Sequence, residues 1–329
     1  MLFSIVIPVY NRPTEVDELL ESLVAQTVDS FEVIVVEDGS VEKSDAVVDR
    51  YRGRLTIKYI DKPNSGPGLS RNAGAAQAEN DRLIFFDSDC IVPPDYLRRV
   101  SDFLDKNKVD AFGGPDAALP SFTTVQKAIN YSMTSFFTTG GIRGGRKSMD
   151  KFHPRSFNLG VSKQAFDAIG GYGTMRFGED IDFSLRLLEN GFSTALIPDA
   201  FVYHKRRTDF KKFFKQVYNS GIARVNLHLV HPGSLKPVHL LPSVFAITMV
   251  LAFVLSVFCP ILVLIPLFYS LLVFMDAAIQ NQSAKVGLYG IAAAWTQLFG
   301  YGTGFIAAAW KRIVLGKKEY KAFEKKFYD

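Results

Sequence analysis

Short apolar runs alternate with amphipathic segments over the first 115 residues of the chain. The runs are four to seven residues long and rich in β-branched and aromatic side chains, which is typical of buried strands. They lie at 4–10, 32–36, 56–60 and 83–86. Helix signals separate them, at 14–20, 44–51 and 68–78. Strands that alternate with helices predict an α/β fold with a mostly parallel sheet flanked by helices.

Residues 116–239 are less regular. A clear amphipathic helix runs from 179 to 190 and is closed by Gly191, because glycine tolerates the left-handed conformation that often ends a helix. A glycine-rich basic loop at 140–147 is either a solvated linker or a grip on an anionic substrate. Its sequence supports the two interpretations equally.

Three long apolar stretches follow, at about 240–258, 261–275 and 286–310. Across them the only charged residues are Asp276 and Lys285. About 20 apolar residues cross the hydrocarbon core of a bilayer, and runs rich in Leu, Ile, Phe and Val insert readily. The pattern favours C-terminal transmembrane helices over the alternative, a buried helical hairpin in a soluble protein.

The charges around these stretches predict the side of the membrane on which the chain lies. Seven lysines and arginines follow Trp310, and such residues are enriched on the cytoplasmic side. The N-terminus resembles a first strand and not a signal peptide, so the N-terminal domain is also expected in the cytoplasm. An integral protein of the cell inner membrane with both ends on one side needs an even number of crossings. Either 240–275 is one kinked span, or one stretch is interfacial or re-entrant.

A basic segment with interleaved phenylalanines, at 204–215, precedes the apolar region. The pattern indicates an interfacial segment that faces anionic lipid. Nucleic-acid binding is the weaker interpretation, because no recognised nucleic-acid-binding module accompanies the segment. We therefore expect a membrane partner and no nucleic acid.

Composition adds two limits. The chain has 329 residues, 48% of them hydrophobic, and a formal net charge of +5, so it is long enough for one large α/β domain and a further part. Its two cysteines, Cys90 and Cys259, exclude a disulfide framework and favour a reducing compartment.

Candidate chemistry begins at Asp87-Ser88-Asp89, which directly follows the apolar run at 83–86. In open α/β sheets, ligands bind outside the carboxyl ends of the strands. Two carboxylates at that edge suit a divalent cation that carries a diphosphate. For this motif alone, a solvated Asp-rich turn is the commoner explanation.

Four motifs in order along the chain change that balance. They are residues 5–12 (IVIPVYNR), 35–40 (VVEDGS), 87–89 (DSD) and 178–182 (GEDID). Over about residues 3–225 the chain resembles the glycosyltransferase family 2 enzymes, and Arg71-Asn72-x-Gly74 also looks like that family. The resemblance implies a nucleotide-sugar-binding fold of the GT-A type and a hexosyltransferase-type glycosyltransferase that takes its sugar from a nucleotide-diphosphate donor.

The resemblance implies roles for individual residues at the nucleotide. Pro8, Asn11 and Asp38 would form the edge that recognises it, with Asp38 accepting a hydrogen bond from the base. Arg71 would approach the phosphates or the base. The alternatives are that Asp38 caps a helix and that Arg71 is a charge on a helix surface. The family favours uridine, so a UDP-sugar is the expected donor.

The resemblance also implies a divalent cation, Mg²⁺ or Mn²⁺, held against the diphosphate by Asp89. Asp87 would contact the ribose or bind the cation through water, and His204 is either a further ligand or a surface residue. Asp180 would be the general base that deprotonates the acceptor hydroxyl in an inverting displacement. The alternative is that Glu179 and Asp180 only stabilise a helix N-terminus, where the dipole attracts acids.

One departure from the family concerns the acceptor. Processive polysaccharide synthases carry a Q-x-x-R-W element near the membrane, and residues 216–220 do not match it. Addition of one sugar to a lipid or lipid-linked glycan is therefore favoured, with Glu179, Gln216 and Arg224 on the acceptor side. The alternatives are a processive synthase with a degenerate element and a non-catalytic sugar-nucleotide-binding membrane protein.

These observations predict four regions along the chain. They are a GT-A catalytic domain at 1–225, a juxtamembrane linker at 226–239, membrane helices at 240–312 and a basic cytoplasmic tail at 313–329. Within the first region, 1–115 would bind the nucleotide and 116–225 the acceptor.

Overall fold

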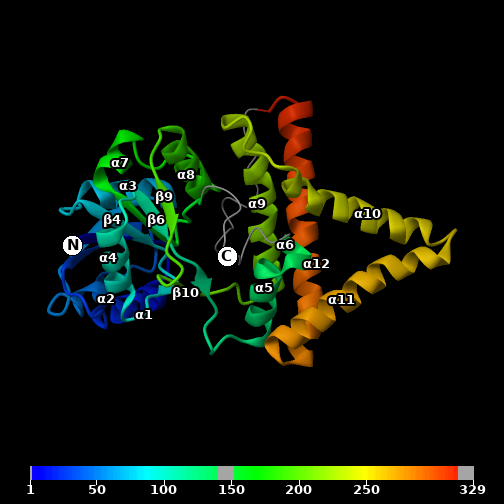
Figure 1. Cartoon of the computed structure of the whole chain (residues 1–329), viewed down its shortest axis with the longest axis horizontal. Helices are drawn as coiled ribbons and strands as arrows, with labels where there is room; N and C mark the ends of the chain where they lie inside the picture. Colours follow the sequence, from blue (N-terminus) through cyan, green and yellow to red (C-terminus); the bar gives the residue numbers. More distant parts are fainter. Residues whose placement is uncertain (1, 140–151, 318–329) are drawn as a thin grey trace. The chain divides into compact units, whose positions relative to one another are not determined.

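The chain folds into two compact units, as Figure 1 shows. The computed structural model describes residues 2–139 and 152–317. The first unit comprises Met1–Leu119 and Arg146–Lys205, and the second comprises Pro120–Gly145 and Arg206–Asp329. The basic loop predicted at 140–147 and the part of the predicted tail from 318 onward lie outside the described residues.

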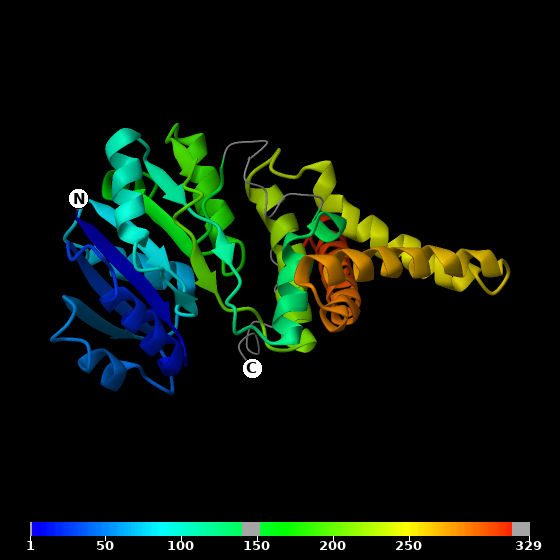
Figure 2. The same ribbon diagram turned by 60° about the horizontal axis from the view of Figure 1, so that its bottom comes forward.

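The first unit is built on a seven-stranded sheet, which Figure 2 shows from a second side. Its strands, in spatial order, are β3 (Ile57–Lys62), β2 (Phe31–Asp38), β1 (Phe3–Val9), β4 (Arg82–Phe86), β8 (Asn158–Ser162), β6 (Ala111–Gly113) and β9 (Thr194–Leu196). Only β8 runs antiparallel to its neighbours, β4 and β6. The predicted α/β fold with a mostly parallel sheet is confirmed.

Helices cover both faces of this sheet. One face packs on α1 (Pro13–Val24), α2 (Asp45–Asp49) and α4 (Tyr96–Lys106). The other packs on α3 (Pro67–Ala76), α7 (Lys163–Ala168) and α8 (Glu179–Glu189). In β1, Ile5 and Ile7 join the first core and Val6 the second. The first apolar run is continuous because a strand buried on both faces has no water-facing side.

A second, three-stranded sheet holds residues that sequence periodicity does not reveal. Its strands, in spatial order, are β5 (Cys90–Ile91), β10 (Val202–His204) and β7 (Asp116–Ala117). The register sets His204 opposite Cys90. His204 therefore belongs to a strand of the first unit, and Lys205 pairs with Glu18 at 2.6 Å. The predicted interfacial segment at 204–215 begins inside a folded sheet, which corrects its N-terminal boundary.

The second unit is helical. Its helices are α5 (Thr124–Thr134), α6 (Phe136–Thr139), α9 (Phe210–Val230), α10 (Leu241–Leu255), α11 (Leu264–Asn281) and α12 (Ala284–Ala309). The short turns η1 (Pro237–Leu240) and η2 (Pro260–Val263) precede α10 and α11, and a π-helical turn, η3 (Trp310–Val314), follows α12. Helix α12 packs against α5, α9, α10 and α11. The contact with α9 is close because Gly304 lies against the Tyr218 backbone, where a Cβ would be 2.2 Å from the carbonyl oxygen.

The compact units divide the chain differently from the predicted regions. Residues 120–139 and the helix α9 belong to the second unit, because α5 and α9 pack against α12. The functional boundaries at 225, 239 and 312 stay predictions.

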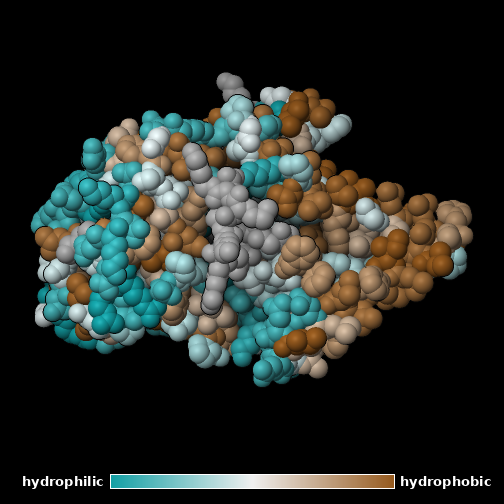
Figure 3. Space-filling model, in the orientation of Figure 1, coloured by the Kyte–Doolittle hydropathy of each residue, from teal (hydrophilic) through white to brown (hydrophobic). Residues whose placement is uncertain are grey.

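Two segments of the second unit are long and apolar enough to cross a membrane. They are Pro237–Leu255 and Pro260–Asn281, with mean hydropathies of 2.3 and 2.2. A turn after α10 separates them, so 240–275 is two helices and not one kinked span. Figure 3 shows the apolar surface that α10 and α11 present. The one acid in this region, Asp276, accepts hydrogen bonds from Tyr131 at 2.7 Å and Ser135 at 3.1 Å.

Candidate functional site

Three parallel strands bring the predicted donor residues to one edge of the sheet. Because β1, β2 and β4 run in the same direction, their carboxyl ends lie together. Asn11 follows β1, Asp38 ends β2, and Asp87 and Asp89 follow β4. Pro8 lies in β1 after Val6, which is the last residue of β1 that pairs with β4. A proline is tolerated there because β4 does not require a backbone N–H donor from that position.

Arg71 connects two of the motifs. Its guanidinium donates to Asp87 Oδ1 at 2.6 Å through Nη2 and to Glu179 Oε1 at 3.2 Å through Nη1. It also lies 5.3 Å from the centre of the Tyr172 ring. Arg71 is 2% exposed, so it is not the surface charge that the sequence left open. One carboxylate of the DSD motif and one of the GEDID motif thus bind the same buried guanidinium group, although about 90 residues separate the two motifs.

Asp180 lies in the first turn of α8, after Gly178 in the left-handed conformation at φ +80°. Arg155 Nε donates to its Oδ2 at 2.5 Å, and the Ile181 N–H donates to its Oδ1 at 2.9 Å. Burial opposes ionisation of Asp180, but the charge and hydrogen bond of Arg155, the charge of Arg71 and the Ile181 N–H together lower the pKa of this carboxyl.

The pKa of the neighbouring carboxyl, that of Glu179, shifts in the opposite direction. Burial, and then the negative charge of Asp180, raise the pKa of Glu179 to about 7, against the opposing charge of Arg71. Two adjacent acids whose pKa values are driven apart take different protonation states near neutrality. Asp180 is the one held as a carboxylate.

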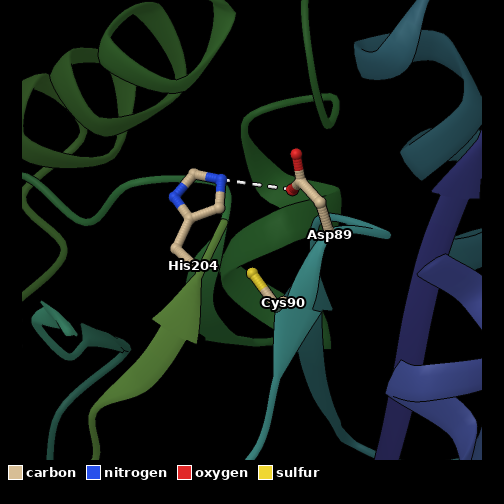
Figure 4. A group of neighbouring side chains, drawn as sticks. All are labelled: Asp89, Cys90 and His204. Atoms are coloured by element: carbon tan, nitrogen blue, oxygen red, sulfur yellow. Dashed lines mark ion pairs between the residues drawn. The ribbon is translucent and has the colours of Figure 1, made fainter. Parts of the chain in front are cut away.

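Asp89 is contacted from both sides, as Figure 4 shows for His204. Arg12 Nη1 lies 2.9 Å from its Oδ2, and His204 Nε2 lies 3.2 Å from its Oδ1. The His204 ring stacks on Phe157 with the ring centres 4.9 Å apart. These contacts fix the imidazole with one nitrogen toward the carboxylate.

The ligand atoms of Asp89, Cys90 and His204 lie within 4.8 Å of one another. Neighbouring ligands of an octahedral cation with bonds of about 2.1 Å are about 3 Å apart, which fits Asp89 Oδ1 and His204 Nε2. The Cys90 thiol fits a hard cation poorly, because burial raises its pKa well above the usual range and it donates to the Phe157 carbonyl oxygen. Asp89 and His204 are therefore the candidate cation ligands.

The nucleotide-edge residues organise loops. The Asn11 side-chain oxygen accepts from the N–H groups of Val41 at 2.8 Å and Glu42 at 3.1 Å, tying the loop after β1 to the loop after β2. The Asp38 carboxylate accepts from the N–H groups of Ser65 and Gly66, at 2.8 and 2.9 Å. Asp38 does not cap a helix, since Ser44 has that place in α2. Its contact with a base stays a prediction.

The acceptor-side residues are distributed over both units. Glu179 lies against Arg71, while Gln216 and Arg224 belong to α9 in the second unit. Their assignment to the acceptor stays a prediction.

Three positively charged side chains that contact site residues of the first unit were not identified from the sequence. Arg12 contacts Asp89, Lys62 donates to Asp38, and Arg155 holds Asp180. Arg12 stands inside the first motif, so its position was a usable signal. Arg155 comes from an irregular stretch before β8 and carries no local signal that would pair it with a residue 25 positions away.

Residues 4–170, just over half of the 329, match the family model described as Glycosyl transferase family 2. An uncharacterized glycosyltransferase of Haemophilus influenzae is 32% identical over 218 residues, which is 63% of this chain and 70% of that protein. The poly(ribitol-phosphate) beta-N-acetylglucosaminyltransferase TarS of Staphylococcus aureus is 35% identical over 114 residues, or 33% of this chain. That match spans 20% of the length of TarS.

Solved structures agree on the fold. The mannosyltransferase PcManGT from Pyrobaculum calidifontis, in complex with GDP-Man and Mn²⁺, has a TM-score of 0.58 at 16% identity, covering 96% of this chain and 88% of that one. TarS residues 1–349 in complex with UDP-GlcNAc have a TM-score of 0.50 at 17% identity, covering 99% and 95%. Identities this low bear on the fold alone, and the predicted GT-A type is confirmed. The match to the family model over half of its length shows that the chain belongs to glycosyltransferase family 2.

Proposed function

We propose that the protein is an inverting, metal-dependent glycosyltransferase that moves one sugar from a UDP-sugar to a lipid or lipid-linked glycan at the cytoplasmic face of the membrane. One observation carries the proposal. The Arg71 guanidinium binds the carboxylates of Asp87 and Glu179, so the predicted donor motif and the predicted base lie on one edge of the same unit.

Asp180 is the proposed base. The acceptor oxygen forms a bond to the anomeric carbon, its proton passes to Asp180, and the bond from that carbon to the donor diphosphate breaks with the electron pair on the leaving oxygen. Arg155 and the Ile181 N–H each occupy one carboxylate oxygen, and each oxygen keeps a lone pair for the proton. One carboxylate suffices because inversion needs no covalent sugar intermediate.

Asp89 and His204 are the proposed holders of a divalent cation, on the 3.2 Å spacing of their ligand atoms. A cation bound there would neutralise charge on the departing diphosphate as a Lewis acid. Asp87 is paired with Arg71, so we assign it to the donor and not to direct coordination.

The donor proposal rests on the site and on relatives. Asp38, at the end of β2, accepts from the Gly66 N–H through Oδ2, and this oxygen has a further lone pair to offer to a base that presents an N–H group. A TarS structure binds UDP-GlcNAc, and this supports uridine for the present chain. A relative named the minor teichoic acid biosynthesis protein GgaB of Bacillus subtilis, 25% identical over 213 residues, supports a place in cell-envelope glycan synthesis.

The acceptor proposal rests on the second unit. Its two candidate spans expose most of their side chains, only 22% and 11% of each being buried within the protein. An acceptor hydroxyl carried by a lipid would lie at the same interface as these helices. The proposed regions are the catalytic domain at 1–225 and the membrane helices at 240–312.

Replacing Asp180 by Asn tests the proposal. Removing a general base lowers turnover by about 10²- to 10⁴-fold, while donor binding, followed by thermal shift with UDP-GlcNAc and Mn²⁺, should persist. Asp182→Asn is the matched control, since Asp182 lies on the same helix and pairs with Arg186. Full transfer by the Asp180→Asn variant would remove Asp180 from this role. Chromatography of the product separates one added sugar from the ladder expected of a processive synthase.

A further inference from the structure

Arg155 contacts the proposed base and does not itself take the proton. It lies in the stretch that precedes β8, where its backbone forms an isolated antiparallel bridge with Asn158. Its side chain is 36% exposed, while that of Asp180 is 11% exposed. An arginine that reaches from a partly exposed position to a buried carboxylate provides the charge which that carboxylate needs in order to stay ionised.

The geometry of the contact is specific. Arg155 Nε donates to Oδ2 at 2.5 Å and the Ile181 N–H to Oδ1 at 2.9 Å, so each oxygen of Asp180 has one fixed donor. Two donors on different oxygens fix the plane of the carboxylate as well as its position. The remaining lone pair on each oxygen then points in a set direction, which proton transfer requires.

Two adjacent carboxyls compete for the role of proton acceptor. Glu179 shares Arg71 with Asp87, so the positive charge of Arg71 is divided between two acids. Asp180 has Arg155 beside it, and the charge of Arg155 lowers the pKa of Asp180 more than the charge of Arg71 does. Among the residues that the structure describes, the ionisable groups near the pair also include Tyr172, toward Glu179 and Asp180, and Asp116, toward Arg155. Arg155 is therefore the group that favours ionisation of Asp180 over ionisation of Glu179.

We propose that Arg155 is the positioning residue of the transfer reaction, selecting Asp180 over Glu179 as the proton acceptor by holding its carboxylate oriented and ionised. The inference rests on the proposed function, because it takes Asp180 to be the base. The same helix provides a structural comparison: Arg186 pairs at 2.9 Å with Asp182, which lies one turn earlier and is the last acid of the GEDID motif but not the proposed base.

The test compares Arg155→Met, Arg155→Lys and Arg186→Met in the full chain. Release of UDP from UDP-GlcNAc to water, with Mn²⁺, is followed from about pH 5 to pH 9, because water needs the same base as an acceptor hydroxyl. We expect Arg155→Met to lower kcat about 10- to 100-fold on the acid side, to leave KM for the donor unchanged, and to move the acid limb of the profile to higher pH. Arg155→Lys should restore part of the activity, and Arg186→Met should leave the limb in place.

The outcomes separate this inference from the proposed function. An acid limb that Arg155→Met does not move overturns the positioning role, whereas an active Asp180→Asn variant overturns the proposed function itself. A double-mutant cycle of thermal unfolding with Arg155→Met and Asp180→Asn gives a second readout that needs no turnover. Non-additive Tm changes support the contact, and additive changes overturn it.

Discussion

The two units of the molecule treat polar and apolar side chains in opposite ways. The first unit buries charged groups in pairs: Arg71, at 2% exposure, contacts Asp87 and Glu179. The second unit exposes apolar groups: Phe253 and Phe258 on the α10–α11 hairpin are 71% and 84% exposed. A charge is buried only with a partner, and a large apolar side chain is exposed at low cost only to an apolar surrounding.

This comparison shows where specificity and location reside. Paired charges at the sheet edge can distinguish a diphosphate, a base and a hydroxyl, because an unmatched buried partner costs about 1–3 kcal/mol. The hairpin offers no such recognition, since from 240 to 275 it has no charged residue. Its uniformly apolar surface suits a lipid phase, because the free energy of transfer into lipid depends on the apolar area removed from water and not on individual contacts.

A charge placed on the hairpin should have the largest effect. Ile247 lies near the middle of the first candidate span and is 51% exposed. Ile247→Lys should weaken insertion by up to about 3 kcal/mol, because a lysine at the centre of a spanning helix is that unfavourable. The measurement is the fraction of full-length protein that floats with phospholipid vesicles.

Val41→Lys is the control for this change. Val41 is an apolar residue of the first unit that is 90% exposed, so a lysine there should stay within about 0.5 kcal/mol of the original stability and leave flotation unchanged. If both lysines left flotation unchanged, the hairpin would be an ordinary water-facing surface and the contrast between the units would fail.

An added methyl group should have the next largest effect. A Cβ at Gly304 would lie 2.2 Å from the Tyr218 carbonyl oxygen, in the α9–α12 contact. Gly304→Ala should lower the free energy of unfolding by about 1–3 kcal/mol, because the helices must separate to admit it. Thermal or denaturant unfolding in detergent measures the loss.

Gly53 provides the matched position in the first unit, since a Cβ there has nothing within 4 Å. Gly53→Ala should leave the free energy of unfolding unchanged or raise it by about 0.4–1 kcal/mol through the unfolded chain. Equal losses of unfolding free energy in Gly304→Ala and Gly53→Ala would show that close packing at glycine is not specific to the contact between α9 and α12.

The smallest effect concerns the paired charges and pH. The pKa of Glu179 is raised to about 7, above its ordinary value of 4.5, so the folded protein keeps a proton that the unfolded chain has released. The free energy of unfolding should therefore fall as pH rises from about 4.5 to about 7, by at most about 1.4 kcal/mol for each pH unit. Glu179→Gln should remove this decline in a series of unfolding curves.

Glu21→Gln serves as the comparison, because Glu21 pairs with Arg54 on the exposed surface. That variant should keep the decline. A decline that persists in Glu179→Gln would assign the pH dependence to another buried group.

Most of the sheet was predictable because its signals are local. The apolar runs at 4–10 and 83–86 are strands wherever they pack, and the positions of Asp38, Asp87 and Asp89 at strand ends follow from them. The helix that begins at Glu179 was equally clear from its amphipathic pattern. The strands β5, β7 and β10 have two or three residues each, too few for any period to show, and so His204 was not placed in a sheet.

Local patterns along the chain are enough to establish the α/β alternation, the carboxylates at the ends of strands and the uncharged C-terminal stretches, because each depends on residues close together in the chain. The folded structure was needed to show that Arg71 joins Asp87 to Glu179, that Arg155 holds Asp180, and that α10 and α11 are separate helices. These features depend on residues brought together from 16 to 108 positions apart, or on a turn whose geometry the surrounding helices set. Side-chain contacts over such separations leave no periodic trace in a single sequence.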